Sequence, residues 1–343
     1  MMIIRPAKSG DIDDILRLAD RSGFGLTSLP KDRDLLFRRI ERSLEAFSQR
    51  PEDGKASSFM FVMEDTASGR VVGTNGLVNR VGMGEPFYAY RVETHIHESK
   101  TLGVRKEIPC LHLLRIRKGP CEIGGLFLDP DFQGHGHGRL LSLSRFLFLA
   151  EHRDLFPSKV IAEMRGMIND QGHSPFWEAV GRKFFDTDFP RADYLSMRDK
   201  RFIAELMPNH PIYIPLLPEE ARSAVGQVHD RTGPALKMLR EEGFEDAGMV
   251  DIFDAGLIIR CDLKKVRTVK EGRKGRFLGA GDPGADTEPR LLSKGALGSF
   301  RAAISPGIIE EPGGVRLPPD VAGGLGLEKG ETVRYLPLRQ KKA

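Results

Sequence analysis

The stretch that decides the fold is residues 121–150, which read CEIGGLFLDPDFQGHGHGRLLSLSRFLFLA. The apolar run Cys121–Leu128 is typical of a buried strand, and Asp129-Pro130 ends it. Glycines and histidines then alternate over 134–138, and an apolar run with helical spacing follows from Arg139. A strand, a glycine loop and a helix in this order favour an anion, because the loop frees backbone N–H groups and the helix N-terminus carries partial positive charge.

Two familiar phosphate loops do not fit this segment. A dinucleotide-binding GxGxxG follows the first strand, whereas Gly134, Gly136 and Gly138 have another spacing and come mid-chain. A Walker loop ends in Gly-Lys-Ser/Thr, and here the sequence is Gly138-Arg139-Leu140. The segment does resemble the Gln/Arg-x-x-Gly-x-Gly/Ala loop, starting at Gln133, with which GCN5-related N-acetyltransferases hold the pyrophosphate of coenzyme A. A glycine turn that serves only strand-to-helix packing is the alternative.

The flanking sequence predicts an α/β fold with a mixed sheet. Two neighbouring strands joined by a turn are the clearest signal of the N-terminal half. Helices and strands alternate on both sides of the central stretch. The predicted elements are a strand over 2–6, a helix from Ile12, a helix over 31–48, the hairpin strands 58–65 and 70–78, a strand over 159–165, a helix over 174–184 and a strand over 249–256.

Length suggests more than one domain, since 343 residues exceed one typical domain. We predict an acyltransferase domain over 1–200, a second acyltransferase-like half over 201–270, a linker over 271–289 and a small β-rich module over 290–343. The two halves in tandem are a hypothesis, which one continuous sheet with a single splayed strand pair would contradict. The basic run Lys264–Arg276 favours a solvated linker over a nucleic-acid contact.

Composition excludes several classes of protein. No apolar run approaches the roughly 18 residues of a membrane span, and the first residues lack a secretory apolar region. Three cysteines without CxxC spacing form neither a disulfide framework nor a recognisable zinc motif. We therefore expect a cytoplasmic chain. The pairs His95/His97 and His135/His137 have no further Cys or His at partner spacing, so we expect no metal.

Motifs along nearly the whole chain resemble arginine N-succinyltransferase. They occur in that family's order, which makes them far more specific than the glycine loop alone. These motifs are LTSLP (26–30), LFLDPD (126–131), IAEMRG (161–166), SPFW (174–177), FIAELMP (202–208), HPIY (210–213), GQVH (226–229) and VDIFDAG (250–256).

The resemblance implies a fold, a reaction and site residues. Members of the family move the succinyl group of succinyl-CoA to the α-amino group of arginine in arginine catabolism, without a metal. The resemblance implies that Leu126 contacts succinyl-CoA and that His229 donates a proton. It also implies that succinyl-CoA binds at the loop residues Gln133, Gly134, Gly136 and Gly138.

The residues themselves are compatible with that chemistry. Amide formation from a thioester needs a neutral amine, a polarised carbonyl and a proton for the leaving thiolate. Histidine exchanges protons near neutrality, which suits His229. Arg165 could pair with the carboxylate of an amino acid, and Glu163 or Glu205 with a guanidinium; ion pairs within the fold would explain these three side chains equally well.

Two departures from the family leave the acceptor open. Residues 115–119 read RIRKG where relatives have a stretch like NDHTG, and Gly125 replaces a threonine. Three cations at 115–118 would favour a less cationic acceptor if they lined the pocket. Ornithine, another amino acid or another acyl-CoA are therefore alternatives, as is a protein that binds CoA without turnover. We expect a small-molecule substrate, no nucleic acid or membrane, and a homo- or hetero-oligomer.

Overall fold

The computed structural model describes residues 1–50, 55–284 and 287–339. Its strands form one mixed sheet in the order β14-β15-β11-β16-β12-β13-β1-β2-β3-β6-β7-β10-β9-β4-β5-β8. The strands are β1 (Met2–Pro6), β2 (Ser58–Asp65), β3 (Val71–Val78), β4 (Phe87–Ser99), β5 (Val104–Ile116), β6 (Cys121–Leu128), β7 (Lys159–Glu163), β8 (Ile212–Tyr213), β9 (Glu245–Val250), β10 (Leu257–Asp262), β11 (Arg273–Ala280), β12 (Arg290–Lys294), β13 (Arg301–Ser305), β14 (Ile309–Glu311), β15 (Gly314–Leu317) and β16 (Thr332–Pro337).

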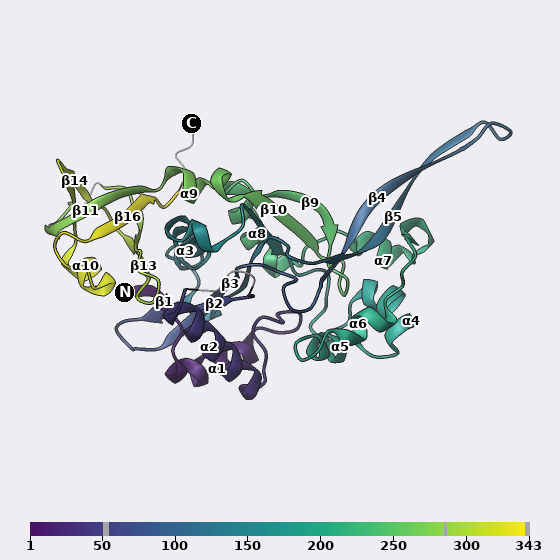
Figure 1. Cartoon of the computed structure of the whole chain (residues 1–343), viewed down its shortest axis with the longest axis horizontal. Coiled ribbons are helices and arrows are strands. Elements are labelled where there is room, and N and C mark those ends of the chain that lie inside the picture. The colour runs from purple at the N-terminus through teal and green to yellow at the C-terminus, as the bar shows by residue number, and fades with distance from the viewer. Residues whose placement is uncertain (51–54, 285–286, 340–343) are drawn as a thin grey trace.

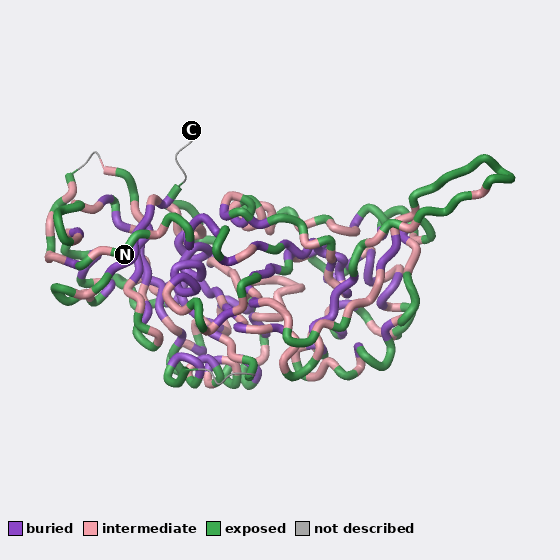
Figure 2. Tube along the Cα trace, turned by 45° about the horizontal axis from the view of Figure 1, so that its top comes forward, coloured by how far each residue is buried: buried purple, intermediate pink, exposed green. Residues whose placement is uncertain are grey.

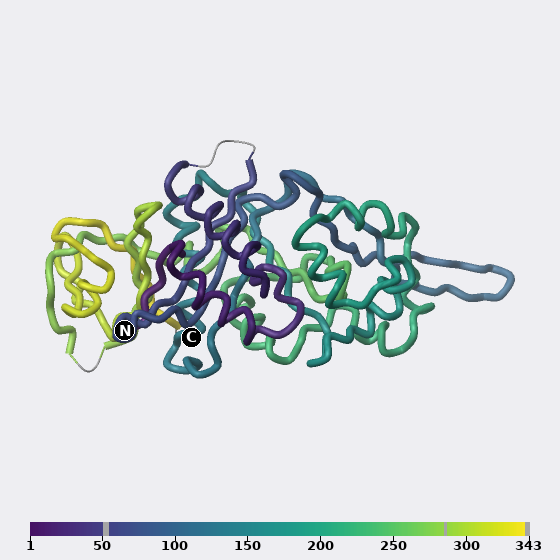
Figure 3. The backbone as a smooth tube through the Cα atoms, turned by 90° about the horizontal axis from the view of Figure 1, so that it is seen from below, coloured from purple at the N-terminus to yellow at the C-terminus, as the bar shows by residue number. Residues whose placement is uncertain are grey.

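Helices cover both faces of the central strands. The apolar stripe of α1 and the buried side of α2 pack below β1–β3, and α3 crosses the opposite face (Figures 1 and 3). The helices are α1 (Ile12–Arg21), α2 (Arg33–Ser48), α3 (His137–Glu151), α4 (Arg182–Phe185), α5 (Phe189–Ser196), α6 (Arg201–Leu206), α7 (Glu219–Ala224), α8 (Gly233–Glu241), α9 (Arg267–Glu271) and α10 (Pro319–Leu325). No helix among the described residues is both long and apolar enough to cross a membrane.

The middle of the sheet contains one short parallel pairing. β6 and β7 run parallel and are in register only at Cys121↔Val160 and Glu122↔Ile161, so the two strands separate beyond those pairs. β10 then pairs antiparallel with β7, and β9 with β10. This continuous sheet with one splayed pair at its centre favours a single acyltransferase core over two halves in tandem. The helix predicted over 174–184 had been one reason to expect two halves. It lies in the segment between β7 and β8.

The strand predicted over 249–256 is wrong in extent. β9 ends at Val250, residues 251–256 form a turn, and β10 follows. Asp251 causes the turn, since its Oδ1 accepts the N–H groups of Phe253 at 2.6 Å and Asp254 at 3.0 Å. Such local side-chain hydrogen bonds compete with a strand.

Two insertions extend the core at one end. β4 and β5 form a long hairpin whose outer part projects from the body as an arm of mostly exposed residues (Figures 1 and 2). Residues 166–228 contribute α4–α7, which pack beside the root of this hairpin (Figure 1). A second hydrophobic cluster lies there, containing Tyr90, Phe176 and Ile252.

At the other end, the C-terminal β-rich segment joins the same sheet, because β13 pairs with β1. The linker predicted over 271–289 is wrong in part, since β11 occupies 273–280 and pairs with β15 and β16. The basic run Lys264–Arg276 is largely solvated as expected, with six of its seven basic side chains exposed, but it forms α9 and the start of β11 rather than a linker. Arg267 is buried and pairs at 2.8 Å with Glu242, which is also buried. Residues 340–343 of the predicted module lie outside the described residues.

Candidate active site

The glycine loop leads directly into α3, as expected. Gly136 is the N-cap of this helix with a φ of 83°, and Gly134 has a φ of 103°. Glycine adopts this left-handed region without the penalty that other residues pay. Gln133 and Gly134 are exposed, while Gly136 and Gly138 are half-buried. The loop therefore presents backbone groups at a helix N-terminus, where an anion is favoured.

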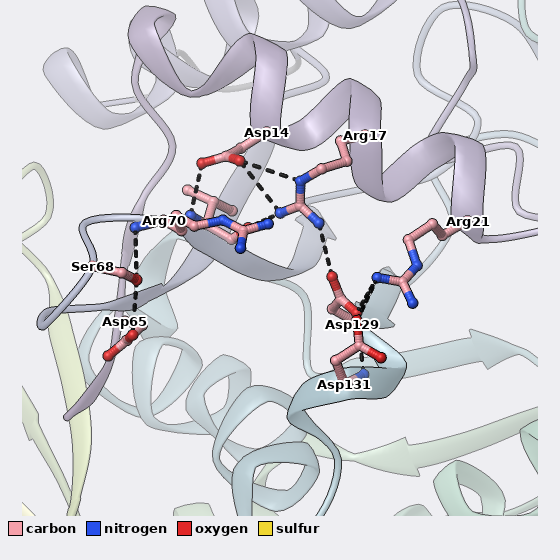
Figure 4. Close-up of polar contacts among 9 residues, drawn as sticks. Asp14, Arg17, Arg21, Asp65, Ser68, Arg70, Asp129 and Asp131 are labelled. Carbon is pink, nitrogen blue, oxygen red and sulfur yellow. Dashed lines mark hydrogen bonds and ion pairs between the residues drawn. The ribbon is translucent and has the colours of Figure 1, made fainter.

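An ionic network holds the end of β6 just before this loop. Asp129 is buried, and its two carboxylate oxygens each lie 2.8 Å from a guanidinium of α1, one from Arg17 and the other from Arg21. Arg21 also pairs with Asp131 at 2.9 Å (Figure 4). The Asp129-Pro130 strand break is thus fixed to α1, and with it the entry into the loop.

β6 carries a bulge at the position expected to contact the acyl donor. Between the pairs Thr74↔Phe127 and Gly76↔Gly124, β6 has one residue more than β3. The extra residue is accommodated at Gly125–Leu126. Gly125 has a φ of 62°, which explains why a glycine suits this position where the family pattern has threonine. Leu126 is half-buried, and its side chain packs against the main core.

His229 lies beside the end of β7. Its backbone N–H donates to the carbonyl of Arg165 at 2.9 Å. Its Nδ1 accepts the backbone N–H of Arg231 at 3.1 Å, so the neutral ring carries its hydrogen on Nε2. Partial burial and the positive charges of Arg165 and Arg231 lower the pKa of His229, which favours the neutral imidazole at neutral pH.

Hydrogen bonds join three of the motifs around that histidine. Gly226 N–H donates to the carbonyl of Ala255 at 2.9 Å, and Gly166 N–H donates to Asp254 Oδ2 at 2.7 Å. The segments 161–166, 226–229 and 250–256 therefore meet, although they lie far apart in the sequence.

Segments 161–166 and 250–256 line a cavity of about 110 Å³, whereas His229 and the rest of 226–229 are not among its lining residues. The cavity lies between the end of β7, the β9–β10 turn, the start of β4, the loop after α1, and α5 with α6. Six charged side chains line the cavity. Glu163 and Arg165 come from the end of β7 and the residues after it, and Asp251 and Asp254 come from the β9–β10 turn. Asp193 lies on α5, and Lys200 directly precedes α6.

The pKa is raised for three of the carboxyl groups that line the cavity. Burial, followed by the nearby charges of Glu122 and Asp251, raises the pKa of Glu163 well above its usual range, although part of the residue is accessible from the cavity. Burial raises the pKa of Asp254 in the same way. For Asp193, burial and the charge of Asp251 raise the pKa to about 7. The cavity therefore has an excess of acid groups that a cation would satisfy.

One cation of the cavity has no partner of its own. Arg165 forms no ion pair within 4 Å among the residues that the structure describes, and its buried Nε has no hydrogen-bond partner there. Its guanidinium lies against the loop after α1, within 4 Å of the positions that a Cβ on Gly23 or Gly25 would occupy. Burial lowers the pKa of Arg165, as expected for a charge that no carboxylate compensates closely. An anion in the cavity would supply the missing partner.

The same loop connects the cavity to the β6 bulge. Gly25 and Thr27 line the cavity, and Ser28 Oγ lies 3.6 Å from the position of a Cβ on Gly125. The predicted donor position near Leu126 and the charged cavity thus lie at two ends of one loop.

Sequence reasoning found part of this cavity. Glu163 and Arg165 line it, whereas Glu205 is exposed on α6 and is not among its lining residues. The stretch 115–119 is also absent from the lining, and Arg115 instead binds Asn209 Oδ1 at 2.7 Å. Asp193, Lys200 and the two turn aspartates were missed as site residues. Only the VDIFDAG motif could have drawn attention to Asp251 and Asp254.

Comparisons with known proteins agree along the whole chain. The family described as arginine N-succinyltransferase beta subunit matches residues 2–268, and the C-terminal domain of that subunit matches residues 274–337. Arginine N-succinyltransferase subunit beta of Pseudomonas aeruginosa is 43% identical over 342 residues, covering 99% of both chains. Arginine N-succinyltransferase of Citrobacter koseri is 46% identical over 275 residues, which are 80% of this chain and 79% of the relative.

A solved structure is similar over the same extent. The arginine/ornithine succinyltransferase subunit AI from Pseudomonas aeruginosa superposes with a TM-score of 0.90 at 34% identity, covering 99% of each chain.

Proposed function

The chain belongs to the arginine N-succinyltransferase family, and on this premise we propose that it transfers the succinyl group of succinyl-CoA to the α-amino group of L-arginine. It is an acyl-CoA-dependent N-acyltransferase with the mixed α/β fold of its relatives. The alternative expected from the altered 115–119 stretch, a less cationic acceptor, loses its basis because that stretch does not line the cavity.

The observation that carries the proposal is the charge pattern of the cavity. Arginine has a carboxylate at one end and a guanidinium at the other. The unpartnered guanidinium of Arg165 suits the carboxylate, since the two groups form paired, charge-assisted hydrogen bonds. The carboxylates of Glu163 and Asp193 suit the guanidinium of the substrate. A neutral or acidic acceptor would leave the four lining carboxyl groups with only Arg165 and Lys200 as counter-charges.

We assign the acyl donor to the region where β6 and β7 separate. Gln133, Gly134, Gly136 and Gly138 would hold the pyrophosphate through backbone N–H groups at the start of α3. The bulge at Leu126 interrupts the ladder with β3 and would offer backbone groups to the pantetheine and the thioester carbonyl. Neither assignment needs a metal.

His229 would transfer the proton during the reaction. The α-amine attacks the thioester carbon, so a C–N bond forms, the C–S bond breaks, and one proton passes from nitrogen to sulfur. The neutral state of His229 is ready to take up a proton, and its Nε2 is the nitrogen free to pass one to the thiolate. The backbone bond to Arg165 ties this ring to the residue proposed to hold the substrate carboxylate.

The test is thiol release from succinyl-CoA and acetyl-CoA with arginine, ornithine, lysine, glutamate and aspartate as acceptors. We expect the highest kcat/KM for succinyl-CoA with arginine. A preference for ornithine would keep the mechanism and change the acceptor, whereas a preference for glutamate or aspartate would contradict the role of the acidic cavity. CoA binding with no turnover on any acceptor would contradict the enzymatic proposal.

A pair of matched variants locates the acceptor site. Glu163→Gln, in the cavity, should raise the KM for arginine by roughly tenfold or more, because a hydrogen bond to a charged group contributes about 1.5–3 kcal/mol. Glu205→Gln, on the exposed side of α6, should leave the KM unchanged. Equal effects of both substitutions would exclude this cavity as the acceptor site.

We also propose that the chain works as part of an oligomer in the cytoplasm. Two relatives are named as subunits, which supports assembly with like or unlike chains. The three cysteines are buried and unpaired, which is typical of a reducing compartment.

A further inference from the structure

The root of the β4–β5 arm holds a cluster of two imidazoles and a carboxylate, outside the proposed active site. Glu93 and His95 lie two residues apart on β4 and therefore share one face of the hairpin. His112 comes from β5, where it pairs with Arg91. Arg91 lies two residues before Glu93 on β4, so His112 lies on the same face of the hairpin as Glu93. The expectation that His95 lacks a partner is wrong, since the antiparallel register brings in a histidine 17 positions away.

The three ligand atoms already have nearly the spacing of a metal site. His112 Nε2 lies 3.1 Å from His95 Nε2 and 3.2 Å from Glu93 Oε2. His95 Nε2 lies 4.0 Å from the same carboxylate oxygen. Around tetrahedral Zn²⁺, bond lengths of about 2.0–2.2 Å place neighbouring ligand atoms roughly 3.4 Å apart. All three atoms lie within 4.8 Å of one another, so small side-chain movements would complete the geometry.

Hydrogen bonding alone satisfies this cluster poorly. His112 Nε2 has at most one hydrogen, yet it faces both a second imidazole nitrogen and a carboxylate oxygen. A divalent cation would satisfy all three atoms at once. Arg91 supports that arrangement, because its Nε binds the other carboxylate oxygen, Glu93 Oε1, at 2.5 Å and leaves Oε2 facing the imidazoles.

We propose that Glu93, His95 and His112 bind a divalent transition metal ion, with Zn²⁺ as the best fit. Two imidazoles and one carboxylate are a donor set that suits zinc. The side chains are 24–35% exposed, so an ion can enter from solvent. Three protein ligands leave a fourth position for water. The ion would join β4 to β5 where the arm leaves the body, and this proposal does not rest on the proposed function.

The test is Zn²⁺ binding to the full chain after treatment with a chelator, measured by calorimetry and by metal content after gel filtration. We expect one equivalent of tightly bound Zn²⁺ and a rise in the melting temperature on its addition. His112→Ala and Glu93→Gln should each weaken binding by more than about tenfold. His97→Ala, on the same strand but outside the cluster, should bind Zn²⁺ as the original chain does.

Cobalt distinguishes this cluster from the buried thiols Cys110, Cys121 and Cys261. Tetrahedral Co²⁺ bound by nitrogen and oxygen shows visible absorption without the intense near-ultraviolet band of thiolate ligands. A thiolate band, the absence of one bound equivalent, or unchanged affinity in both His112→Ala and Glu93→Gln would overturn the proposal. Melting curves of the metal-free variants show whether they fold, so that lost binding is not mistaken for lost structure.

Discussion

At the scale of single residues, the contacts of His229 with the backbone of Arg165 and Arg231 give it a defined protonation state. Its pKa is lowered by partial burial and by the charges of Arg165 and Arg231, and its Nδ1 is occupied by a backbone N–H. These contacts leave one ring nitrogen, Nε2, available for proton exchange. The role implied by family resemblance is therefore compatible with the local chemistry.

His229→Ala should lower kcat by about 10²- to 10⁴-fold, which is the usual contribution of a general acid–base group. The dissociation constant for CoA should stay within about twofold, since the ring is not assigned to the pyrophosphate. Steady-state kinetics and calorimetry with CoA measure the two quantities. His173→Ala, on the loop after β7, is the control. Normal turnover in the His229 variant would remove this residue from the mechanism.

Some site residues could be predicted from local sequence, whereas others depend on contacts with residues far away in the chain. His229 and Leu126 came from motifs, and Glu163 with Arg165 came from their place in a predicted strand. Asp193 could not be foreseen, because its raised pKa depends on burial beside Asp251, which lies 58 positions away. Such proximity is a property of the fold rather than of any local pattern.

At the scale of elements, the turn into α3 depends on a backbone shape rather than on a side chain. Gly136 has a φ of 83°, and a Cβ there would lie 3.3 Å from Ile304 Cδ1 and 3.5 Å from a methyl group of Leu338. The added side chain would therefore point toward the C-terminal segment. A loss of CoA affinity would therefore arise from a distorted loop rather than from a side chain placed in the phosphate pocket.

Gly136→Val should accordingly weaken CoA binding and also lower the melting temperature. A β-branched residue in the left-handed region costs on the order of 1–3 kcal/mol. Thermal unfolding and calorimetry with CoA would show both effects together. Gly84→Ala, where a Cβ meets nothing within 4 Å and φ is not positive, should change neither. Weak CoA binding at an unaltered melting temperature would point instead to a direct clash with the ligand.

Elements with strong periodicity were predicted well, and elements set by distant contacts were not. The strand Cys121–Leu128, the helix after it and the β2–β3 hairpin match their predictions closely. β11 was taken for a linker because its glycines and cations hide a strand that only pairing with β15 and β16 stabilises. The splay between β6 and β7 likewise has no signature in the sequence.

At the scale of the whole molecule, the acid groups of the cavity make stability depend on pH. A carboxyl group whose pKa is higher in the folded state than in the unfolded state binds more protons when folded. Its contribution to the free energy of unfolding is therefore lost as pH rises. Burial and neighbouring carboxylates raise the pKa of Glu122, Glu163 and Asp254, and that of Asp193 to about 7. His229 acts in the opposite direction, but only as pH falls toward and below its ordinary pKa.

The free energy of unfolding of the ligand-free chain should therefore fall as pH rises from about 6.5 to 8. Urea unfolding at several pH values in this window measures the slope. Asp193→Asn should flatten it, because burial and the charge of Asp251 raise the pKa of Asp193 to about 7 and the variant has no proton to lose at that position. Glu205→Gln should keep the original slope. A free energy that rises with pH in this window would contradict the protonated state assigned to the cavity.

We expect the arm to contribute to contacts with other chains. Its outer residues include the exposed apolar side chains Ile96, Leu102 and Val104, of which Leu102 is 76% exposed. Replacing Ile96 and Leu102 with glutamate should reduce the mass of the assembly measured by light scattering after gel filtration, because charge at an apolar contact opposes its burial. Phe184→Glu, an exposed aromatic away from the arm, is the control. An unchanged mass would place subunit contacts elsewhere.

The pairing of β1 with β13 has a consequence for synthesis of the chain. Ile3 pairs with Ala303, so β1 leaves the ribosome 300 residues ahead of its partner strand. Until that partner emerges, β1 has only β2 beside it, and its other edge stays open to pairing with foreign strands. Contacts between residues so distant in sequence slow folding. The nascent chain therefore cannot complete its sheet during most of translation, and we expect its folding in the cell to finish only after the last strands leave the ribosome.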